Sequence, residues 1–260
     1  MAPRLLGRRI EGLEVFLAKA VKGLPVEEAR ARLAGQVIGG LTRRGKYLLL
    51  ETAVGDTLAF HLRMTGQLLL RPAGSEREPY TRLVFGLSHG EELRFTDVRK
   101  FGGFHYLVPG ALLPRGLAEL GPEPLEAGFD RAALAAALAG RRAPLKNVLL
   151  DQRRVAGIGN IYADEILHRA GLSPLRPAAS LAGAEIAALH SAIHEVLAEG
   201  IACRGTTRRN YVDGDGRPGG YQDRLQVYGR AGESCPACAA PIERTVLAGR
   251  GTYYCPRCQT

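Results

Sequence analysis

The sequence lacks the marks of a secreted or membrane-bound protein. It has five cysteines, and because four of them fall in the last 26 residues, Cys203 stands alone in the rest of the chain. This scarcity excludes the disulfide framework of a small secreted protein and fits a reducing cytosol. The basic opening Met1–Arg9 reaches Glu11 without an apolar signal region, and no stretch has membrane-spanning length. We therefore expect a soluble, cytoplasmic protein with no membrane partner.

The sequence is also poor in acidic residues relative to basic ones. It has 35 Lys and Arg against 26 Asp and Glu, which gives a formal charge of +9 and a pI near 9.6. Such an excess favours a polyanionic partner, nucleic acid before membrane, although a merely basic protein is the alternative. At 260 residues and 46% hydrophobic, the chain can bury a substantial core in one large or two smaller domains.

The four C-terminal cysteines form two Cys-x-x-Cys pairs with 16 residues between them. They are Cys235, Cys238, Cys255 and Cys258. Each pair can direct two sulfurs at one ion, so the spacing predicts a closed Cys₄ zinc site with a structural role. Two local disulfides or four unused thiols remain the alternative. By contrast, His190 and His194 lie four apart on a predicted helix without a neighbouring glutamate, so we expect solvated histidines and no second metal site.

The residue patterns divide the chain into a β-rich half and a helical half, with no internal repeat. Four runs read as strands of an antiparallel sandwich: 46–51, 57–62, 82–87 and 92–95. Helices are predicted from Asp130 to Ala139 and from Asn160 to Arg169, each capped by its first residue, and from Ile186 to Gly200. The expected divisions are an N-terminal sandwich (1–112), a Pro- and Gly-rich linker (113–130), a helical domain (131–226) and a zinc ribbon (227–260).

A Gly-x-Gly turn precedes the second predicted helix. Gly157–Asn160 would place backbone N–H groups and a helix N-terminus where a phosphate could bind, with Lys146 nearby. Taken alone, the same pattern is more typical of a tight turn between helices. Within a basic chain, it favours a phosphate clamp.

Longer segments resemble the bacterial formamidopyrimidine-DNA glycosylases, which excise oxidised purines. Leu149–Gln152 and Val155–Glu165 are similar to that family's helix-two-turns-helix motif, and Tyr228–Arg230 with Arg250–Gln259 is similar to its C-terminal finger. The resemblance implies an α+β multidomain fold with an N-terminal antiparallel β-sandwich, a helix-two-turns-helix domain and one structural zinc ion. It also implies a monomeric, nucleoid-associated bacterial glycosylase and AP lyase that acts on duplex DNA with oxidised purines or abasic sites.

The resemblance assigns roles by position. Lys46 would contact the lesion and assist β-elimination, and Arg250 would grip phosphates and aid δ-elimination. Met64 would fill the gap left by an extruded nucleotide, Arg99 would pair with the orphaned base, and Phe101 would insert beside it. By itself, Lys46 is as well explained as a strand-end charge, and Met64 is more typical of a core residue. The alternative for Arg99 is a hairpin turn in which it and Lys100 form a solvated pair.

Further DNA contacts follow from the same resemblance. They fall on Tyr80, Arg141, Lys146 and Asn160. Tyr80 stands where the family usually has a histidine, so it could bond phosphate but is a poor candidate for proton transfer. The polar, Gly-rich stretch 204–221 is similar to the loop that closes over extruded 8-oxoguanine. Its candidate contact residues are Thr206, Thr207, Arg208 and Tyr211, and the same motif includes Arg209 and Asn210.

One family feature is missing from the printed sequence, which opens Met1-Ala2-Pro3 where the family has an N-terminal proline followed by glutamate. In the family, that proline's amine attacks the sugar and the glutamate handles protons. We expect the natural protein to carry this segment upstream of Met1. The alternatives are a non-catalytic binder of damaged DNA and, less well matched, a zinc-ribbon accessory protein that binds RNA or acts in transcription.

Overall fold

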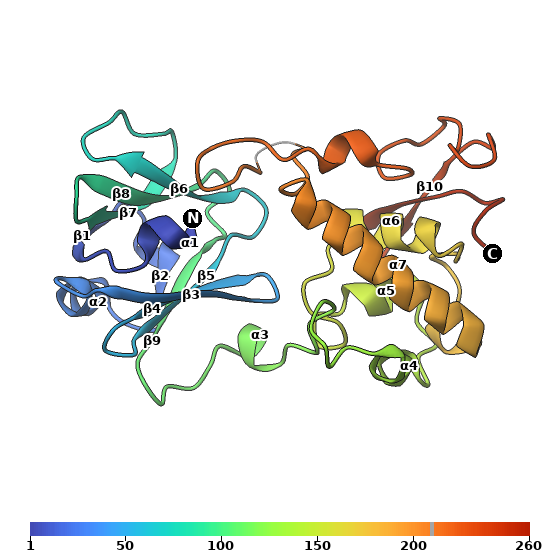
Figure 1. Ribbon diagram of the computed structural model, residues 1–260, viewed down its shortest axis with the longest axis horizontal. Helices are drawn as coiled ribbons and strands as arrows, with labels where there is room; N and C mark the ends of the chain where they lie inside the picture. Colours follow the sequence, from blue (N-terminus) through green and yellow to red (C-terminus); the bar gives the residue numbers. More distant parts are fainter. Residues whose placement is uncertain (209–210) are drawn as a thin grey trace. The chain divides into compact units, whose positions relative to one another are not determined.

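The computed structural model describes residues 1–208 and 211–260, so Arg209 and Asn210 of the predicted loop lie outside the described residues. The chain divides into two compact units (Figure 1). The first contains Met1–Ala118 and Thr206–Gly219, and the second contains Glu119–Gly205 and Gly220–Thr260. The predicted lesion loop thus falls mainly in the first unit, although the sequence pattern attached it to the helical domain.

The first unit is built on two β-sheets. One has the strand order β1-β7-β8-β6 and is antiparallel throughout: β1 (Ile10–Val15), β7 (Thr81–Leu87), β8 (Glu91–Asp97) and β6 (Gly66–Pro72). The other has the order β2-β9-β5-β4-β3, in which the β2–β9 pair is parallel: β2 (Val21–Lys22), β9 (Gly103–Leu107), β5 (Thr57–His61), β4 (Tyr47–Thr52) and β3 (Ile38–Arg44). All four predicted strand segments are strands in the structure.

Both sheets contribute side chains to one apolar core, and the predicted sandwich is thereby confirmed. Phe85 and Phe95 of the first sheet pack on Phe60 and Phe104 of the second, with ring centroids 5.2–6.4 Å apart across the cluster. Short helices complete this unit: α1 (Ala2–Leu5), the 3₁₀ helix η1 (Ala18–Ala20), α2 (Val26–Leu33) and α3 (Arg115–Ala118). Helix α2 buries Ala29 and Leu33, four apart on one helical face.

The second unit is helical. Its elements are α4 (Arg131–Leu138), α5 (Leu145–Leu150), α6 (Asn160–Arg169), η2 (Ala178–Ser180), α7 (Gly183–Ala202) and η3 (Tyr221–Arg224). Asp130 caps α4 as predicted, because its carboxylate accepts the Ala133 N–H at 2.8 Å. The predicted Asn160 cap is wrong by one residue: Gly159 is the N-cap of α6, so Asn160 is its first helical residue.

A β-hairpin lies in the second unit, between the two cysteine pairs. Strands β10 (Glu243–Leu247) and β11 (Arg250–Tyr254) are joined by Ala248 and Gly249, which both have positive φ. Two such residues give the tight turn whose twist matches a hairpin. Within the part of the chain that the structure describes, no helix is long and apolar enough to cross a membrane.

Candidate nucleic-acid interface and metal centre

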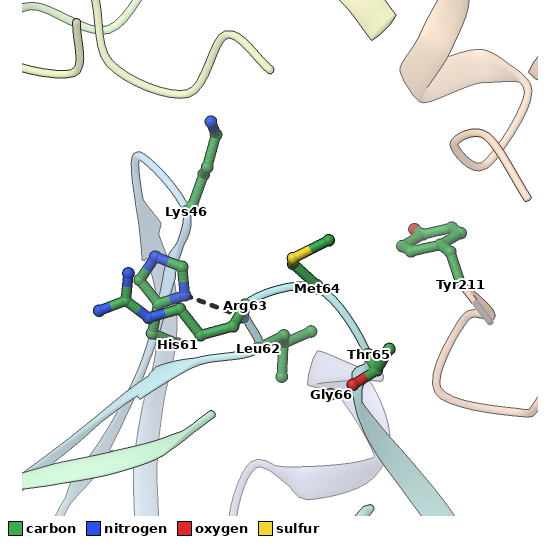
Figure 2. A pocket seen from close by; sticks show the side chains of 8 residues that line it. All are labelled: Lys46, His61, Leu62, Arg63, Met64, Thr65, Gly66 and Tyr211. Atoms are coloured by element: carbon green, nitrogen blue, oxygen red, sulfur yellow. Dashed lines mark hydrogen bonds between the residues drawn. The ribbon is translucent and has the colours of Figure 1, made fainter. Parts of the chain in front are cut away.

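The first unit contains a cavity of about 220 Å³, shown in Figure 2. Its lining residues are Lys46, His61, Leu62, Arg63, Met64, Thr65, Gly66 and Tyr211. The wall of this cavity is formed by the β3–β4 turn, the segment from the end of β5 to the start of β6, and the loop 206–219. The structure therefore brings together three of the residues singled out in the sequence: Lys46, Met64 and Tyr211.

Lys46 stands at the tip of the β3–β4 hairpin. Arg44 and Tyr47 are the last paired residues, so Gly45 and Lys46 form a two-residue turn, and Gly45 has the positive φ (55°) such a turn requires. The lysine side chain is exposed, and Figure 2 shows it extending beyond the strand ends. The short turn thus presents a primary amine beside the cavity.

His61, which the sequence reasoning passed over, is a neutral donor in this wall. Its Nδ1 accepts the Arg63 backbone N–H at 3.0 Å, so the proton of the neutral ring lies on Nε2. Burial lowers the pKa of His61 to about 4, and the nearby positive charges of Arg63, Lys46 and Lys22 act in the same direction. At neutral pH the cavity thus holds an uncharged N–H group among several cations. Its position three residues before Met64 is the signal that could have identified it.

Met64, Arg99 and Phe101 form one exposed cluster on two loops of the first unit. The Arg99 Nη1 lies 2.8 Å from the Met64 sulfur, and its guanidinium carbon lies 4.9 Å from the centre of the Phe101 ring. Met64 is 71% exposed and Phe101 53%, which is unusual for side chains of this size and polarity. The cluster presents apolar surface to solvent, unlike a core residue or a solvated turn.

Both of these loops, and the one before β7, contain a residue in the left-handed region. Arg63, Lys100 and Tyr80 have φ values of 58°, 60° and 65°, a conformation that costs a non-glycine residue energy. Each is next to or is itself a residue singled out in the sequence. Tyr80 is 55% exposed and its ring lies 5.5 Å from the guanidinium carbon of Arg82. Strained backbone therefore accompanies the candidate contact residues.

The loop 206–219 is organised by its own polar side chains. The Thr207 hydroxyl donates to the Tyr211 carbonyl at 2.7 Å and accepts the Gly219 N–H at 2.9 Å. Farther along, the Gly214 carbonyl accepts the N–H of Leu70 on β6 at 2.9 Å. Thr206 is half-buried and Arg208 is exposed. The loop is thus fixed to itself at Thr207 and to the sheet at Gly214, and Tyr211 lies between these points.

In the second unit, Lys146 is buried, which does not fit the DNA contact predicted for it. Its ammonium lies 2.7 Å from Asp164, and both side chains are fully buried. It also donates to the Gly251 carbonyl at 2.9 Å and to the Thr252 hydroxyl at 2.8 Å. Burial raises the pKa of Asp164 to about 6 and lowers that of Lys146, because dehydration disfavours both charges.

The same set of bonds fixes the hairpin next to Arg250. Asn160 donates its amide N–H to the Gly251 carbonyl at 3.0 Å, and Asp164 accepts the Tyr253 N–H at 3.0 Å. Helices α5 and α6 therefore hold strand β11 from Gly251 onward, and Arg250 stays exposed at its start. One N–H group of the predicted phosphate clamp already has a partner within the protein, because the Gly157 N–H donates to the Gln152 side chain at 2.9 Å. Arg141 is exposed after α4.

The four C-terminal cysteines make the predicted metal centre. Their sulfurs all lie within 4.8 Å of one another, with Cys238 to Cys255 at 3.5 Å and Cys235 to Cys258 at 3.9 Å. A tetrahedron with zinc–sulfur bonds of about 2.3 Å has edges of about 3.8 Å, so these residues fit one structural zinc ion. None of the cysteines forms a disulfide, and all five are described. His168 adds a contact from α6, its Nε2 lying 3.6 Å from the Cys235 sulfur.

The two histidines of α7 are packed rather than solvated, so that prediction needs correction. The Nε2 of His190 lies 2.8 Å from the Phe129 carbonyl and 3.3 Å from the Nε2 of His194. The His190 ring stacks on the Phe129 ring at 5.8 Å. Among the described residues, the candidate metal cluster consists of the four cysteines and does not include this pair.

Comparisons with known proteins agree across the chain. Residues 1–104 match the family model of the formamidopyrimidine-DNA glycosylase N-terminal domain, residues 120–211 that of its H2TH domain, and residues 232–260 a zinc finger found in FPG and IleRS. The chain is 51% identical over 246 residues to the formamidopyrimidine-DNA glycosylase of Moorella thermoacetica, covering 94% of this chain and 89% of that protein. It is 47% identical to that of Carboxydothermus hydrogenoformans, covering 100% and 95%.

Solved structures give the same result. The complex between the Lactococcus lactis FPG (MutM) and a FAPY-dG containing DNA has a TM-score of 0.91 and 36% identity, with 99% of this chain and 95% of that chain covered. MutM in complex with carbocyclic 8-oxo-G containing DNA has a TM-score of 0.91 and 37% identity, with 99% and 94% covered.

Proposed function

Since the chain belongs to the formamidopyrimidine-DNA glycosylase family, we propose that it excises oxidised purines from duplex DNA and then cleaves the abasic site by β,δ-elimination. Relatives and DNA-bound structures both support oxidised-purine base-excision repair. The observation that carries the proposal is the exposed cluster of Met64, Arg99 and Phe101 beside a cavity with a lysine.

The cluster suits an enzyme that extrudes a base. Extrusion leaves a gap in the stack, and an apolar side chain inserted there keeps the duplex open. In our proposal Met64 fills the gap and Phe101 wedges the adjacent step. Arg99 has a planar fork that can bond the edge of a cytosine, the partner of a guanine-derived lesion.

The cavity suits the sugar and its reacting carbon. Lys46 would supply an amine there and assist β-elimination, while the neutral His61 ring would offer its Nε2–H to a phosphate or sugar oxygen. Tyr211, with Thr206, Thr207 and Arg208 of its loop, would cover the extruded base. A loop attached at two points can close over a ligand without unfolding.

The remaining exposed basic and polar groups would contact the DNA backbone. Arg250 would bind phosphates next to the lesion and aid δ-elimination, and the bonds from Lys146 and Asn160 to Gly251 would hold it in place. Tyr80 and Arg141 would add phosphate contacts. Such contacts position the enzyme without reading sequence. The zinc site would stabilise the hairpin, since structural zinc stabilises the folded state directly.

The protein would act as a cytoplasmic monomer associated with the nucleoid through its DNA affinity. The basic charge of +9 and the pI near 9.6 support such binding. A non-catalytic binder of damaged DNA is the second candidate, because the exposed cluster of Met64, Arg99 and Phe101 could hold an opened duplex without any excision chemistry.

Borohydride trapping tests the proposal and separates the two candidates. The printed polypeptide, and one extended at its start by the family's Pro-Glu segment, would be incubated with duplexes carrying 8-oxoguanine opposite cytosine or an abasic site. Reduction makes any Schiff base permanent. We expect a covalent adduct and strand cleavage with the extended chain. Tight binding of 8-oxoguanine DNA with no adduct from either polypeptide would instead support the non-catalytic binder.

A triple variant tests the role of the exposed cluster. Met64→Ala, Arg99→Ala and Phe101→Ala together should weaken binding of an 8-oxoguanine duplex by at least about a hundredfold, as for the loss of three interface anchors. Affinity for single-stranded DNA with an abasic site should change little, because no base has to be extruded there. Undiminished affinity for the lesion duplex would contradict the assignment.

A further inference from the structure

We infer that Asp97, acting through Thr65, is a positioning residue that holds Met64, Arg99 and Phe101 as one rigid wedge. The inference rests on the proposed function, because it assigns the wedge its role in opening the DNA stack. Its evidence is a set of bonds inside the first unit that leads from one buried carboxylate to both wedge loops. Asp97 does not touch DNA in this proposal, so it acts through the loops that it holds.

Asp97 accepts hydrogen bonds from both loops at once. The side chain is 1% exposed and stands at the end of β8. Its Oδ1 accepts the Thr65 hydroxyl at 2.5 Å and the Arg99 N–H at 3.2 Å, and its Oδ2 accepts the N–H groups of Phe101 and Gly102 at 2.8 Å each. The four donors come from both sides of the wedge, so this carboxylate fixes the loops relative to each other.

Thr65 provides the link to the methionine loop. Its hydroxyl donates to Asp97 and also accepts the Arg99 N–H at 3.1 Å. Met64 is the residue before it, and the Met64 sulfur lies 2.8 Å from Arg99. A single hydroxyl thus joins the loop that carries Met64 to the loop that carries Arg99.

The two loops also converge on one ring of the core. A Cβ added to Gly66 would lie 2.9 Å from the Phe95 ring and 2.4 Å from the Leu62 carbonyl. A Cβ added to Gly102 would lie 2.7 Å from the same ring and 3.0 Å from the His61 carbonyl. Both positions therefore require glycine so that the two loops can pack closely on the Phe95 ring, which supports both of them.

Rigidity of the wedge matters for DNA opening. Inserting side chains into a stack costs less when they are already ordered, because their conformational entropy is lost on folding and not on binding. Hydrogen bonds to a charged acceptor are stronger than bonds to a neutral one, so a carboxylate holds the loops better than an amide. Although burial acts to raise the pKa of Asp97, the Thr65 hydroxyl and the three N–H donors lower it below its usual range. The carboxylate stays charged at neutral pH.

Two substitutions test whether Asp97 and Thr65 hold the two wedge loops together. Asp97→Asn replaces the charged acceptor, and Thr65→Val removes only the hydroxyl while it keeps the side-chain shape. We expect each to weaken binding of an 8-oxoguanine duplex about tenfold, the effect of losing one bond to a charged group. Thr65→Ser keeps the hydroxyl, so it should bind the 8-oxoguanine duplex as tightly as the original protein does. Thr96→Val is the matched control, since Thr96 is buried one residue before Asp97 and its hydroxyl bonds Gln67 at 3.2 Å.

Hydrogen exchange on the protein without DNA gives a readout that is independent of function. The amides of Arg99, Phe101 and Gly102 bond Asp97 directly, so in Asp97→Asn we expect them to exchange at least about tenfold faster than in the original protein. In the Thr96→Val control these amides should exchange as before. Unchanged exchange in Asp97→Asn would overturn the inference by itself.

A double-mutant cycle between wedge residues measures their coupling in DNA affinity, which a general loss of stability would not change. In the original protein, the combined Met64→Ala and Phe101→Ala variant should depart about fivefold from the product of the two single losses in affinity, because the residues act as one unit. In the Thr65→Val background the same cycle should be multiplicative within about twofold. Equal coupling in both backgrounds would overturn the role of Thr65.

The outcomes separate this inference from the proposed function. If Met64→Ala, Arg99→Ala and Phe101→Ala all leave lesion affinity unchanged, the wedge itself is wrong and both proposals fail. If those variants weaken binding while Thr65→Val and Asp97→Asn do not, the wedge stands and the positioning role of Asp97 is wrong.

Discussion

Replacing Lys146 with methionine should destabilise the second unit more than any exposed substitution there. The lysine is fully buried and its ammonium lies 2.7 Å from Asp164, which is also fully buried. Methionine has a similar length and no charge. The substitution would therefore leave a carboxylate in the interior without its cation, and it would remove the donor to the Gly251 carbonyl and the Thr252 hydroxyl.

The expected size follows from those contacts. Removing one partner of a buried ion pair costs about 3–5 kcal/mol, because the other charge is left uncompensated. Asp164 would keep one donor, the Tyr253 N–H. Burial already raises the pKa of Asp164 to about 6, so without the lysine the carboxyl should be protonated at neutral pH, which places the cost near the lower end.

A second variant isolates the charge. Lys146→Met combined with Asp164→Asn removes both charges and keeps an acceptor for the Tyr253 N–H, so we expect it to recover at least about 2 kcal/mol relative to Lys146→Met alone. Arg141→Met is the matched control, because it removes an exposed basic residue from the same unit and should change stability by less than about 0.5 kcal/mol.

Urea unfolding of the zinc-loaded protein, followed by far-UV circular dichroism, measures these differences in the helical unit. Lys146→Met, alone or combined with Asp164→Asn, should lower the ratio of δ- to β-elimination products on an abasic duplex, because Gly251 follows Arg250 and loses its anchor. A loss of stability below about 1 kcal/mol for Lys146→Met, or a double variant as unstable as the single one, would refute the argument from an unpaired buried charge.

Three further outcomes follow from the site. Because the pKa of His61 is lowered to about 4 by burial and then by Arg63 and Lys46, the unfolded state binds more protons below pH 6.5. Stability should fall by about 1–2 kcal/mol, after allowance for solvent screening, as the pH drops from 6.5 to 4, and His61→Gln should flatten this part of the stability profile. Removing zinc with a chelator should unfold the β10–β11 hairpin, which amide exchange spectra would detect. His168→Phe should speed zinc loss about tenfold, because it removes the contact with Cys235. An unchanged rate of zinc loss would show that this contact does not stabilise the site. Lys100→Val should cost about 1–2 kcal/mol in thermal unfolding and Lys100→Asn almost nothing, since φ is 60° there.

The elements that the sequence predicted are those with regular periods. The four predicted strand segments, the helix capped by Asp130 and the long helix α7 follow from alternating or helical apolar patterns. Strand β1 was not predicted, because its buried residues Ile10 and Leu13 are three apart. The pairing of β1 with β7 shifts register between Ile10 and Gly12, so the strand has no alternating pattern. Strand β3 has a similar shift between Ile38 and Gly40.

The candidate site divides in the same way. The four cysteines follow from spacing alone, since a metal-binding pair is a local pattern. Lys146 could not be placed correctly, because lysine is almost never fully buried unless paired, and its partner Asp164 is distant in sequence. The contact of Arg99 with Met64 joins residues 35 apart, so it depends on the pairing of β6 with β8. Sequence patterns identify the chemical groups, whereas tertiary pairing determines which of them meet.

Buried acids explain how a basic protein keeps its basic groups in place. Asp97, Asp164 and Glu165 are each 1–2% exposed, and each accepts backbone N–H groups. Glu165 accepts three of them in succession, at residues 226–228, where the zinc ribbon begins. Exposed carboxylates would repel phosphates, whereas the charge of these buried ones is engaged by the N–H groups that they accept. We therefore expect amide substitutions at these three positions to loosen the attached segments without increasing the affinity for undamaged DNA, as simple removal of a surface negative charge would do.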